Sequence, residues 1–172
     1  MSARIPIWAA DGAIRTWAIV DDADFEWLNQ WRWCLGTKGY AIRRGRKTAG
    51  EPRTTFRMSR QITGLERGDS RQVDHINGNR LDNRRSNLRI VSGTAANMQN
   101  IRGAYRGAAS RFRGVCYRAP KTANQRPKWT ASARLNGKLH HLGTHATEEA
   151  AAQAAAAWRA ANMPFSAEAA TS

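Results

Sequence analysis

The sequence predicts an α+β fold that combines small antiparallel sheets with a few short helices. Residues 14–20 alternate apolar and polar side chains, as a half-buried strand does. Residues 73–91 predict a strand, a polar loop and a returning strand, and Asn77-Gly78 is a strong turn signal within them. Residues 110–165 hold three strand-like runs and an Ala-rich helix. We therefore expect a small N-terminal sheet leading into a strand–loop–strand core, followed by a three-stranded antiparallel sheet packed on one α-helix.

These segments predict two domains joined by a linker. The first spans residues 1–100, with its core at about 55–100. Gly and Ala with scattered Arg at 101–109 are typical of a linker. The second domain spans 110–165, and residues 166–172 are expected to be a frayed tail.

The charge balance points to a polyanionic partner. The 172 residues carry a net charge of +15, and from Asn83 to Thr147 there is no Asp or Glu while thirteen Lys and Arg occur. Such a surface favours nucleic acid, because binding releases counterions from the phosphates. A solvated or ribosome-associated basic protein is the alternative that charge alone leaves open.

The cysteines and the hydropathy pattern predict a cytoplasmic protein. Cys34 and Cys116 form no C-x-x-C pair, so no structural zinc is expected. Two free thiols suit a reducing compartment. No apolar run is long enough to span a bilayer, and residues 1–4 open no signal peptide.

The N-terminal region is expected to contain two short helices and several strands. Residues 21–24 supply an N-cap and first-turn acids for the first helix, and residues 59–65 predict the second, ended by Gly64. Three further strands are expected at 31–35, 40–44 and 54–58. Four aromatic residues are expected in the core rather than stacked on bases: Trp27, Trp31, Trp33 and Tyr40.

The polar stretch holds the residues best suited to chemistry. Asp74 and His75 end its first strand, Asn87 opens its second, and Asn97 lies on a helix expected to begin near Ala95. Carboxylate and amide oxygens suit Mg²⁺ or Mn²⁺. Histidine titrates near neutrality, as a general base requires. The order strand, loop, strand, helix can gather these side chains around one small pocket.

Three spaced elements of this stretch resemble a known family. Asp74-His75-Ile76-Asn77-Gly78-Asn79, then residues 83–89, then Asn97-Met98-Gln99-Asn100 look like the ββα-metal core of HNH endonucleases, most closely the homing type of phages and introns. The resemblance covers roughly residues 55–100. It implies hydrolysis of a DNA phosphodiester with one divalent ion, Mg²⁺ or Mn²⁺, in a protein of phage or mobile-element origin.

The resemblance also implies a role for each residue. Asp74 and Asn97 are metal ligands, and His75 is the general base that takes a proton from water. Asn87 bonds backbone or ring atoms near His75 and so fixes the direction of the imidazole. These four residues are the expected catalytic and metal site.

Two features depart from the family pattern. Ser59 stands where many relatives have His, and the spacing from Asn87 to Asn97 is one residue longer than usual. Asn100, one helical turn later, is the alternative ligand. Two further polar residues are expected to hold the loop rather than bind metal: Asp82 and Asn83.

The C-terminal segment resembles a second family. Residues 110–115, 129–131, 142–144 and 147–151 look like the Apetala-type, ethylene-response-factor-like DNA-binding domain over about 110–165. In that family the exposed face of the sheet enters the major groove, where Arg bonds guanine and cations meet phosphates. Arg113 and Arg134 are expected to contact bases, and the lysines to contact phosphates. The resemblance implies five DNA-binding residues: Arg113, Arg118, Lys128, Arg134 and Lys138.

Local patterns refine this segment. Asn136-Gly137 predicts a type I′ hairpin turn, and Thr147 caps a helix that runs to about Ala161. His140 and His141 are not expected to form a metal site with His145, because adjacent strand residues point to opposite faces. The inward stripe of the helix is expected to be Ala150, Ala154, Ala157, Trp158 and Ala161.

Together the two resemblances predict a site-specific, homing-type DNA endonuclease that acts on double-stranded DNA as a monomer or weak dimer. The alternative is a non-cleaving, sequence-specific DNA-binding regulator that retains an inactive HNH scaffold. A third interpretation, an RNA-binding protein, predicts a preference for structured RNA over duplex DNA.

Overall fold

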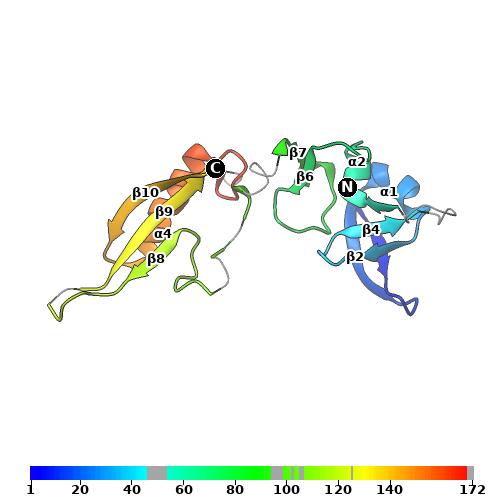
Figure 1. Ribbon diagram of the computed structural model, residues 1–172. Helices are drawn as coiled ribbons and strands as arrows, with labels where there is room; N and C mark the ends of the chain where they lie inside the picture. The colour runs from blue at the N-terminus through cyan, green and yellow to red at the C-terminus, as the bar shows by residue number, and fades with distance from the viewer. Residues whose placement is uncertain (46–53, 94–98, 102, 105–106, 125, 170–172) are drawn as a thin grey trace. The chain divides into compact units, whose positions relative to one another are not determined.

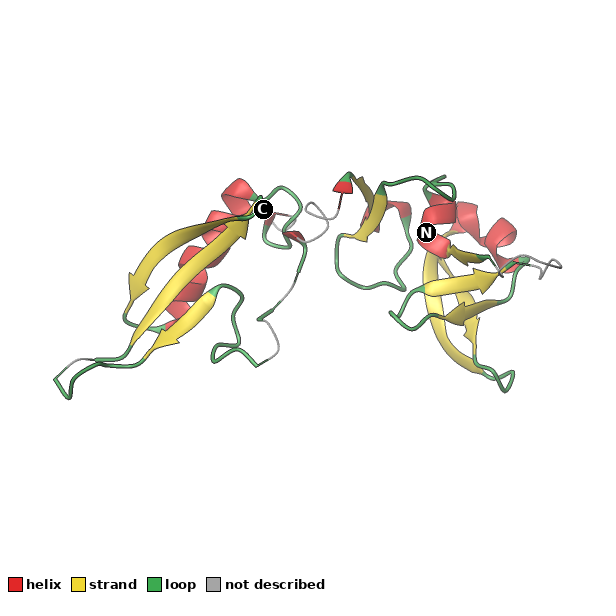
Figure 2. Ribbon diagram, viewed as in Figure 1, coloured by secondary structure: helices red, strands yellow, loops and turns green. Residues whose placement is uncertain are grey.

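The structure is a computed structural model that describes residues 1–45, 54–93, 99–101, 103–104, 107–124 and 126–169. The chain divides into two units, Met1–Thr94 and Ala95–Ser172 (Figure 1). Small sheets and short helices occur in both, which confirms the predicted α+β class (Figure 2). Within the described ranges, no helix is both long and apolar enough to cross a membrane.

A five-stranded sheet dominates the first unit. Its strand order is β2-β1-β3-β4-β5, so β2 and β5 are the edges. Neighbouring strands are antiparallel except β1 and β3, which are parallel. The elements are β1 Ser2–Trp8, β2 Ile14–Asp21, α1 Asp22–Asn29, β3 Trp33–Leu35, β4 Ala41–Arg44 and β5 Thr55–Arg57.

The aromatic residues of this unit mostly serve its core, as expected. Trp33 is fully buried and its Nε1 donates to the Leu28 carbonyl over 2.8 Å. Trp27 and Trp31 pack against the same core and meet edge to face. The buried apolar residues are Ile5, Ile7, Ala18, Val20, Leu28, Trp33, Ala41, Met58 and Ile62.

Strand β1 is an element that the sequence did not predict. Pro6 argues against a strand because it cannot donate to a ladder. In the structure Pro6 lies opposite Trp17 of β2, while β3 pairs with β1 only at Ile7 and Trp8, so this strand accommodates the proline.

A second, two-stranded sheet carries the polar stretch. After α2 (Met58–Ile62), β6 (Gln72–His75) pairs antiparallel with β7 (Leu88–Val91), and a short 3-10 helix, Arg85–Asn87, precedes β7. Gly78 has φ +76° and its N–H donates to the His75 carbonyl over 2.8 Å, so the predicted turn forms. The helix expected near Ala95 lies outside the described residues.

The second unit is a three-stranded antiparallel sheet packed on one helix, as predicted. The order is β10-β9-β8, and α4 packs on one face. Asn136 and Gly137 have φ of 50° and 80°, as a type I′ turn requires. Thr147 caps α4 by accepting from the Ala150 N–H over 3.1 Å. The elements are β8 Val115–Arg118, β9 Lys128–Leu135, β10 Lys138–His145 and α4 Glu148–Asn162.

Two details of this unit differ from the sequence-based expectations. The buried stripe of α4 is Ala151, Ala155 and Arg159, one position away from the predicted one. Arg159 can be buried in this stripe because its charge is paired with Glu168 over 2.6 Å. A search for apolar periodicity does not detect a buried arginine. The same pair packs residues 166–169, where Ser166 is fully buried, instead of leaving them frayed.

Candidate active site

Asp74 lies at the end of β6 with its carboxylate bonded to the opposite strand. Arg89, its cross-strand partner on β7, donates to Asp74 Oδ2 from Nε over 2.9 Å and pairs through Nη2 over 2.7 Å. The carboxylate is almost buried, and Arg89 is itself largely covered. The guanidinium therefore fixes the position of this carboxylate and supplies the opposite charge that a buried anion needs.

His75, the next residue, is almost completely buried and is held by an amide. Its Nε2 lies 3.2 Å from Asn83 Oδ1. An amide oxygen accepts a hydrogen bond, so this contact favours the tautomer with the proton on Nε2 and an unprotonated Nδ1.

The surroundings of the imidazole favour its neutral form. Burial lowers the pKa of His75 below its ordinary value, and the contact with Asn83 only partly opposes this effect. The charges of Asp74 and Asp82 also raise the pKa slightly, whereas Arg80 lowers it. A neutral imidazole near pH 7 is what a general base requires.

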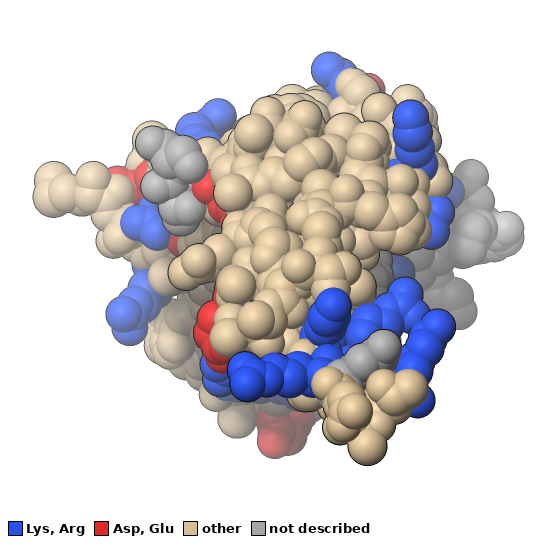
Figure 3. Space-filling model, turned by 90° about the vertical axis from the view of Figure 1, so that its left-hand side faces the viewer, with Lys and Arg blue, Asp and Glu red and all other residues tan. Residues whose placement is uncertain are grey.

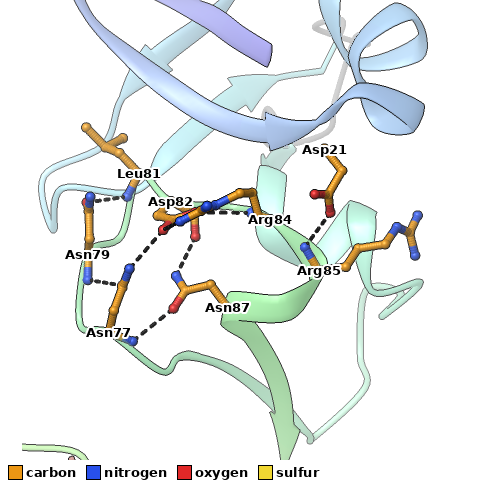
Figure 4. A network of polar contacts seen from close by, with 8 residues as sticks. All are labelled: Asp21, Asn77, Asn79, Leu81, Asp82, Arg84, Arg85 and Asn87. Carbon is orange, nitrogen blue, oxygen red and sulfur yellow. Dashed lines mark hydrogen bonds and ion pairs between the residues drawn. The ribbon is translucent and has the colours of Figure 1, made fainter. Parts of the chain in front are cut away.

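Asn87 braces the loop between the two strands. Its Oδ1 accepts from the Asn77 N–H over 2.9 Å, and its Nδ2 donates to the Asp82 carbonyl over 2.7 Å (Figure 4). Asn77 in turn donates from Nδ2 to Asp82 Oδ2 over 2.8 Å, and Arg84 pairs with that oxygen over 2.6 Å. Asn87 thus bonds backbone near His75, while the ring itself is contacted by Asn83.

The loop is also fastened to the edge of the five-stranded sheet. Ile19 of β2 donates to the Leu81 carbonyl over 2.8 Å and accepts from the Asn83 N–H over 2.7 Å. These two bonds form a parallel bridge between Ile19 and Asp82, which adds a short segment of the loop to the sheet beside its edge strand β2. Because Asn83 is bonded both to β2 and to His75, the sheet sets the position of the imidazole.

A second attachment joins the loop to the start of α1. The Arg85 N–H donates to Asp21 Oδ2 over 2.8 Å, and its guanidinium pairs with the buried Asp24 over 2.7 Å. The acidic residues that the sequence gathers at the start of α1 therefore neutralise an arginine of the polar loop.

The described residues contain half of the expected metal-ligand pair. Asp74 is described, whereas Asn97 lies in the segment 94–98, which is not. Within the described ranges no three His, Cys, Asp or Glu side chains come together. A buried carboxylate with a second oxygen ligand still suits a hard divalent ion, which completes its shell with water and phosphate oxygens.

Ser59, which departs from the family pattern, and Asn100, the alternative metal ligand, lie in different units of the chain. Ser59 is buried inside α2, where its carbonyl accepts from Thr63. Asn100 belongs to the second unit. Neither observation adds a ligand to the described part of the site.

A scan against protein-family models bears directly on this loop. Residues 64–98 match a family of HNH endonucleases. The matched segment contains Asp74, His75, Asn83 and Asn87 and reaches the position of Asn97. The match supports a nuclease that acts on DNA, and nucleases with this domain generally use a divalent metal ion. Searches of curated proteins and of solved structures found no match.

The loop between β6 and β7, residues 76–87, lies in the segment that matches the HNH family and is called the HNH loop below. Tyr40 is a neighbour of this loop, although sequence reasoning assigned it only to the core. It immediately precedes β4, and its ring centroid lies 5.8 Å from that of His75. No local signal points to this contact, because the two residues are 35 positions apart. Asn83 was expected to hold the loop, and nothing in its neighbours in sequence indicated a bond to the ring.

The open face of the second sheet carries three of the five expected DNA contacts. Strand pairing places Arg118 of β8 directly opposite Lys128 of β9, so these two side chains lie on the same face of the sheet. The buried Ala131 and Ala133 face α4, so Lys128 and Arg134 lie on the other face. Seen from the side of the second unit, Lys and Arg gather in the lower part of the surface and the centre carries neither (Figure 3).

The other two expected contacts have different surroundings. Arg113 Nη1 donates to the carbonyls of Gln99 and Ile101 over 2.8 and 2.7 Å, so its guanidinium binds the segment before the sheet. Lys138 pairs with Leu135 at the hairpin end, on the face opposite to Arg134 by alternation. Both remain predictions as DNA contacts.

The histidines of β10 follow the predicted alternation. His140 packs on Trp158 of α4 with ring centroids 4.7 Å apart, while His141 is exposed. In the part of the chain that the structure describes, they belong to no metal-binding group.

Proposed function

We propose that the chain is a homing-type, metal-dependent DNA endonuclease in which the HNH loop cleaves and the C-terminal sheet binds the duplex. The observation that carries the proposal is His75: a buried imidazole, fixed by Asn83, beside a carboxylate and inside the segment that matches the HNH family. A surface loop that only held itself together would not need a histidine in this state.

In the proposed reaction, Nδ1 of His75 takes a proton from the attacking water. In the tautomer that the contact with Asn83 favours, Nδ1 is the nitrogen that accepts a proton. Asp74 and Asn97 would hold one Mg²⁺ or Mn²⁺, which when bound neutralises charge on the phosphate and assists the leaving oxygen. Arg89 orients the Asp74 carboxylate through Oδ2. Asn87 acts through the backbone, by keeping the loop in the shape that presents the imidazole.

The DNA is proposed to be double-stranded and to lie along the open face of the second sheet, as in an Apetala-type domain. Arg118, Lys128 and Arg134 lie on that face. Arg and Lys there suit guanine edges and phosphates. Use of Arg113 requires that it leave the carbonyls of Gln99 and Ile101. With a single catalytic loop, a monomer nicks one strand, and a double-strand break needs a dimer.

The test is a supercoiled-plasmid assay with Mg²⁺ or Mn²⁺, repeated with EDTA. The wild type should nick and EDTA should abolish nicking. His75→Ala should lower the rate by about 10²–10⁴-fold, the usual contribution of a general base. His75→Gln, which better fills the buried space, and the circular dichroism spectrum of both variants control for unfolding. Equal nicking by folded His75→Ala and wild type would contradict the catalytic role.

The rival function is a DNA-binding regulator with an inactive HNH scaffold. The pairing of Asp74 with Arg89 favours it, because the guanidinium competes with a cation for the same carboxylate. Specific duplex binding without metal-dependent nicking would support this rival.

A further inference from the structure

Tyr40 gathers two arginines next to His75. The guanidinium carbons of Arg57 and Arg80 lie 4.8 and 5.0 Å from the centroid of the Tyr40 ring. The three residues come from three places: the residue before β4, the end of β5, and the loop between β6 and β7. The fold thus assembles a basic cluster, Tyr40–Arg57–Arg80, beside the imidazole.

This cluster differs from the other arginines near the HNH loop. Arg84, Arg85 and Arg89 each pair with an aspartate carboxylate. Among the described residues, no carboxylate pairs with Arg57 or Arg80, and both side chains are exposed. Arg80 donates to the Lys38 carbonyl over 2.6 Å, a contact that positions the guanidinium and leaves its charge unbalanced.

Two like charges over one ring repel each other, so an arrangement of this kind is stabilised when an anion binds. Cation–π contacts with Tyr40 hold both planar groups in place before the anion arrives. The Tyr40 ring that holds them lies 5.8 Å from the His75 ring, centroid to centroid. An anion bound by this cluster would therefore lie within the surroundings of the proposed general base.

A hollow beside Arg57 extends this basic surface. It has a volume of about 360 Å³ and is formed by β5, α2 and the loop that follows. Arg67 lines it with Arg57 and forms no ion pair to the described chain. Arg60 and Asp69 line the hollow as well, and the Asp69 carboxylate pairs with Arg71. The hollow therefore carries more positive than negative charge, which suits a polyanion.

We propose that Arg57 and Arg80, held against Tyr40, bind backbone phosphates of the DNA strand that the HNH loop cleaves. This inference rests on the proposed function, because it assigns the site a second group of substrate contacts. The first unit then grips the strand at the point of cleavage, independently of the sheet in the second unit. Guanidinium groups suit this role, since they bond two phosphate oxygens at once.

The first experiment measures binding without cleavage. In the full chain carrying His75→Ala, the affinity for a mixed-sequence duplex is measured by fluorescence anisotropy across a range of salt concentrations. Each lost phosphate contact lowers the slope of log K against log salt by about 0.9. Arg57→Gln and Arg80→Gln together should therefore lower it by about 1.8.

Matched variants separate charge from structure. Arg32 is exposed in the same unit and lies 5.0 Å from the Trp8 ring, so Arg32→Gln removes an equivalent surface cation. It should leave the slope unchanged. Arg57→Lys and Arg80→Lys together keep the charge and should preserve most of the slope. A slope that is unaffected by the double Gln variant, or lowered equally by the double Lys variant, would overturn the proposal.

The second experiment uses cleavage and distinguishes the two proposals. In the chain with His75 intact, the double Gln variant should lower kcat/KM for plasmid nicking by about 10- to 100-fold, and Arg32→Gln should not. If the wild type nicks DNA but the double Gln variant leaves the slope of log K against log salt unchanged, the phosphate contacts are refuted and the nuclease is not. If the wild type does not nick DNA but the double Gln variant lowers the slope, the nuclease is refuted. The cluster is then a phosphate contact of a DNA-binding protein.

Discussion

The HNH loop of the first unit and the open sheet face of the second differ in what their cations bond to. Arg84, Arg85 and Arg89 each bond an aspartate of the same unit. On the open face, neither Arg118 nor Lys128 pairs with a carboxylate of the described residues.

The difference teaches that net charge alone does not locate a binding surface. Arg84, Arg85 and Arg89 serve the geometry of the site, because each one is balanced by a carboxylate and fixes a segment of chain. Cations of the sheet face remain unbalanced, so a polyanion gains by approaching them. Sorting each arginine by its partner therefore separates positioning groups from candidate DNA contacts.

The largest expected effect concerns the bonds within the loop. Asn87→Ala leaves the Asn77 N–H and the Asp82 carbonyl without their partners, and a buried group left unpaired costs about 1–3 kcal/mol. We expect the free energy of unfolding to fall by about 2–4 kcal/mol. Urea unfolding followed by tryptophan fluorescence measures it, since five of the seven Trp lie in the first unit.

Asn79→Ala is the matched control for this loop. Asn79 is exposed and its Oδ1 bonds only the Leu81 N–H, over 3.1 Å. Its loss should change the free energy of unfolding by less than about 1 kcal/mol, because water replaces the bond. Equal effects of the two substitutions would mean that Asn87 does not brace the loop.

The next effect concerns the unbalanced cations of the sheet. Arg118→Gln and Lys128→Gln should each lower the slope of log K against log salt by about 0.9 and together weaken duplex binding by about tenfold or more at low salt. Arg111→Gln removes a cation that lies 3.5 Å from Glu149 and should change the slope less. If all three variants behave alike, ion pairing does not distinguish DNA contacts from other surface arginines.

The smallest expected effect is the loss of stability at low pH, as Asp82 becomes protonated. The hydrogen bond from Arg84 holds the pKa of Asp82 below its ordinary value, so ionised Asp82 stabilises the fold above about pH 4, and this stabilisation is lost as the pH falls through the lowered pKa. Asp82→Asn removes it at every pH. The difference in unfolding free energy between wild type and variant should therefore shrink as the pH falls from about 5 through the lowered pKa of Asp82. A constant difference would show that the charge of Asp82 contributes nothing.

Local patterns were enough to predict much of the fold. The strand–loop–strand of residues 73–91, the Asn136-Gly137 turn and the Thr147 cap each follow from residues close together in the chain. Strand β1 was not predicted, and it includes Pro6, which lies opposite Trp17 of β2 although a proline usually argues against a strand.

The candidate site was harder to predict, because its supports are distant in sequence. Asp74, His75 and Asn87 were identified by their pattern, but Arg85 meets Asp24 across 61 positions and Tyr40 meets His75 across 35. Arg113 was predicted to contact a base. No nearby residue in the sequence indicated that its Nη1 donates to the carbonyls of Gln99 and Ile101. Sequence reasoning thus supplied the candidate site residues, and the structure adds the distant residues that hold them.

The bridge from Ile19 to the segment around Asp82 has a consequence for how such a catalytic motif can be moved between proteins. An excised piece limited to residues 64–98 keeps the motif but loses the strand edge that aligns Asn83 with the imidazole. A transplanted motif has to travel with β2, or land beside a host strand that offers the same pair of backbone bonds.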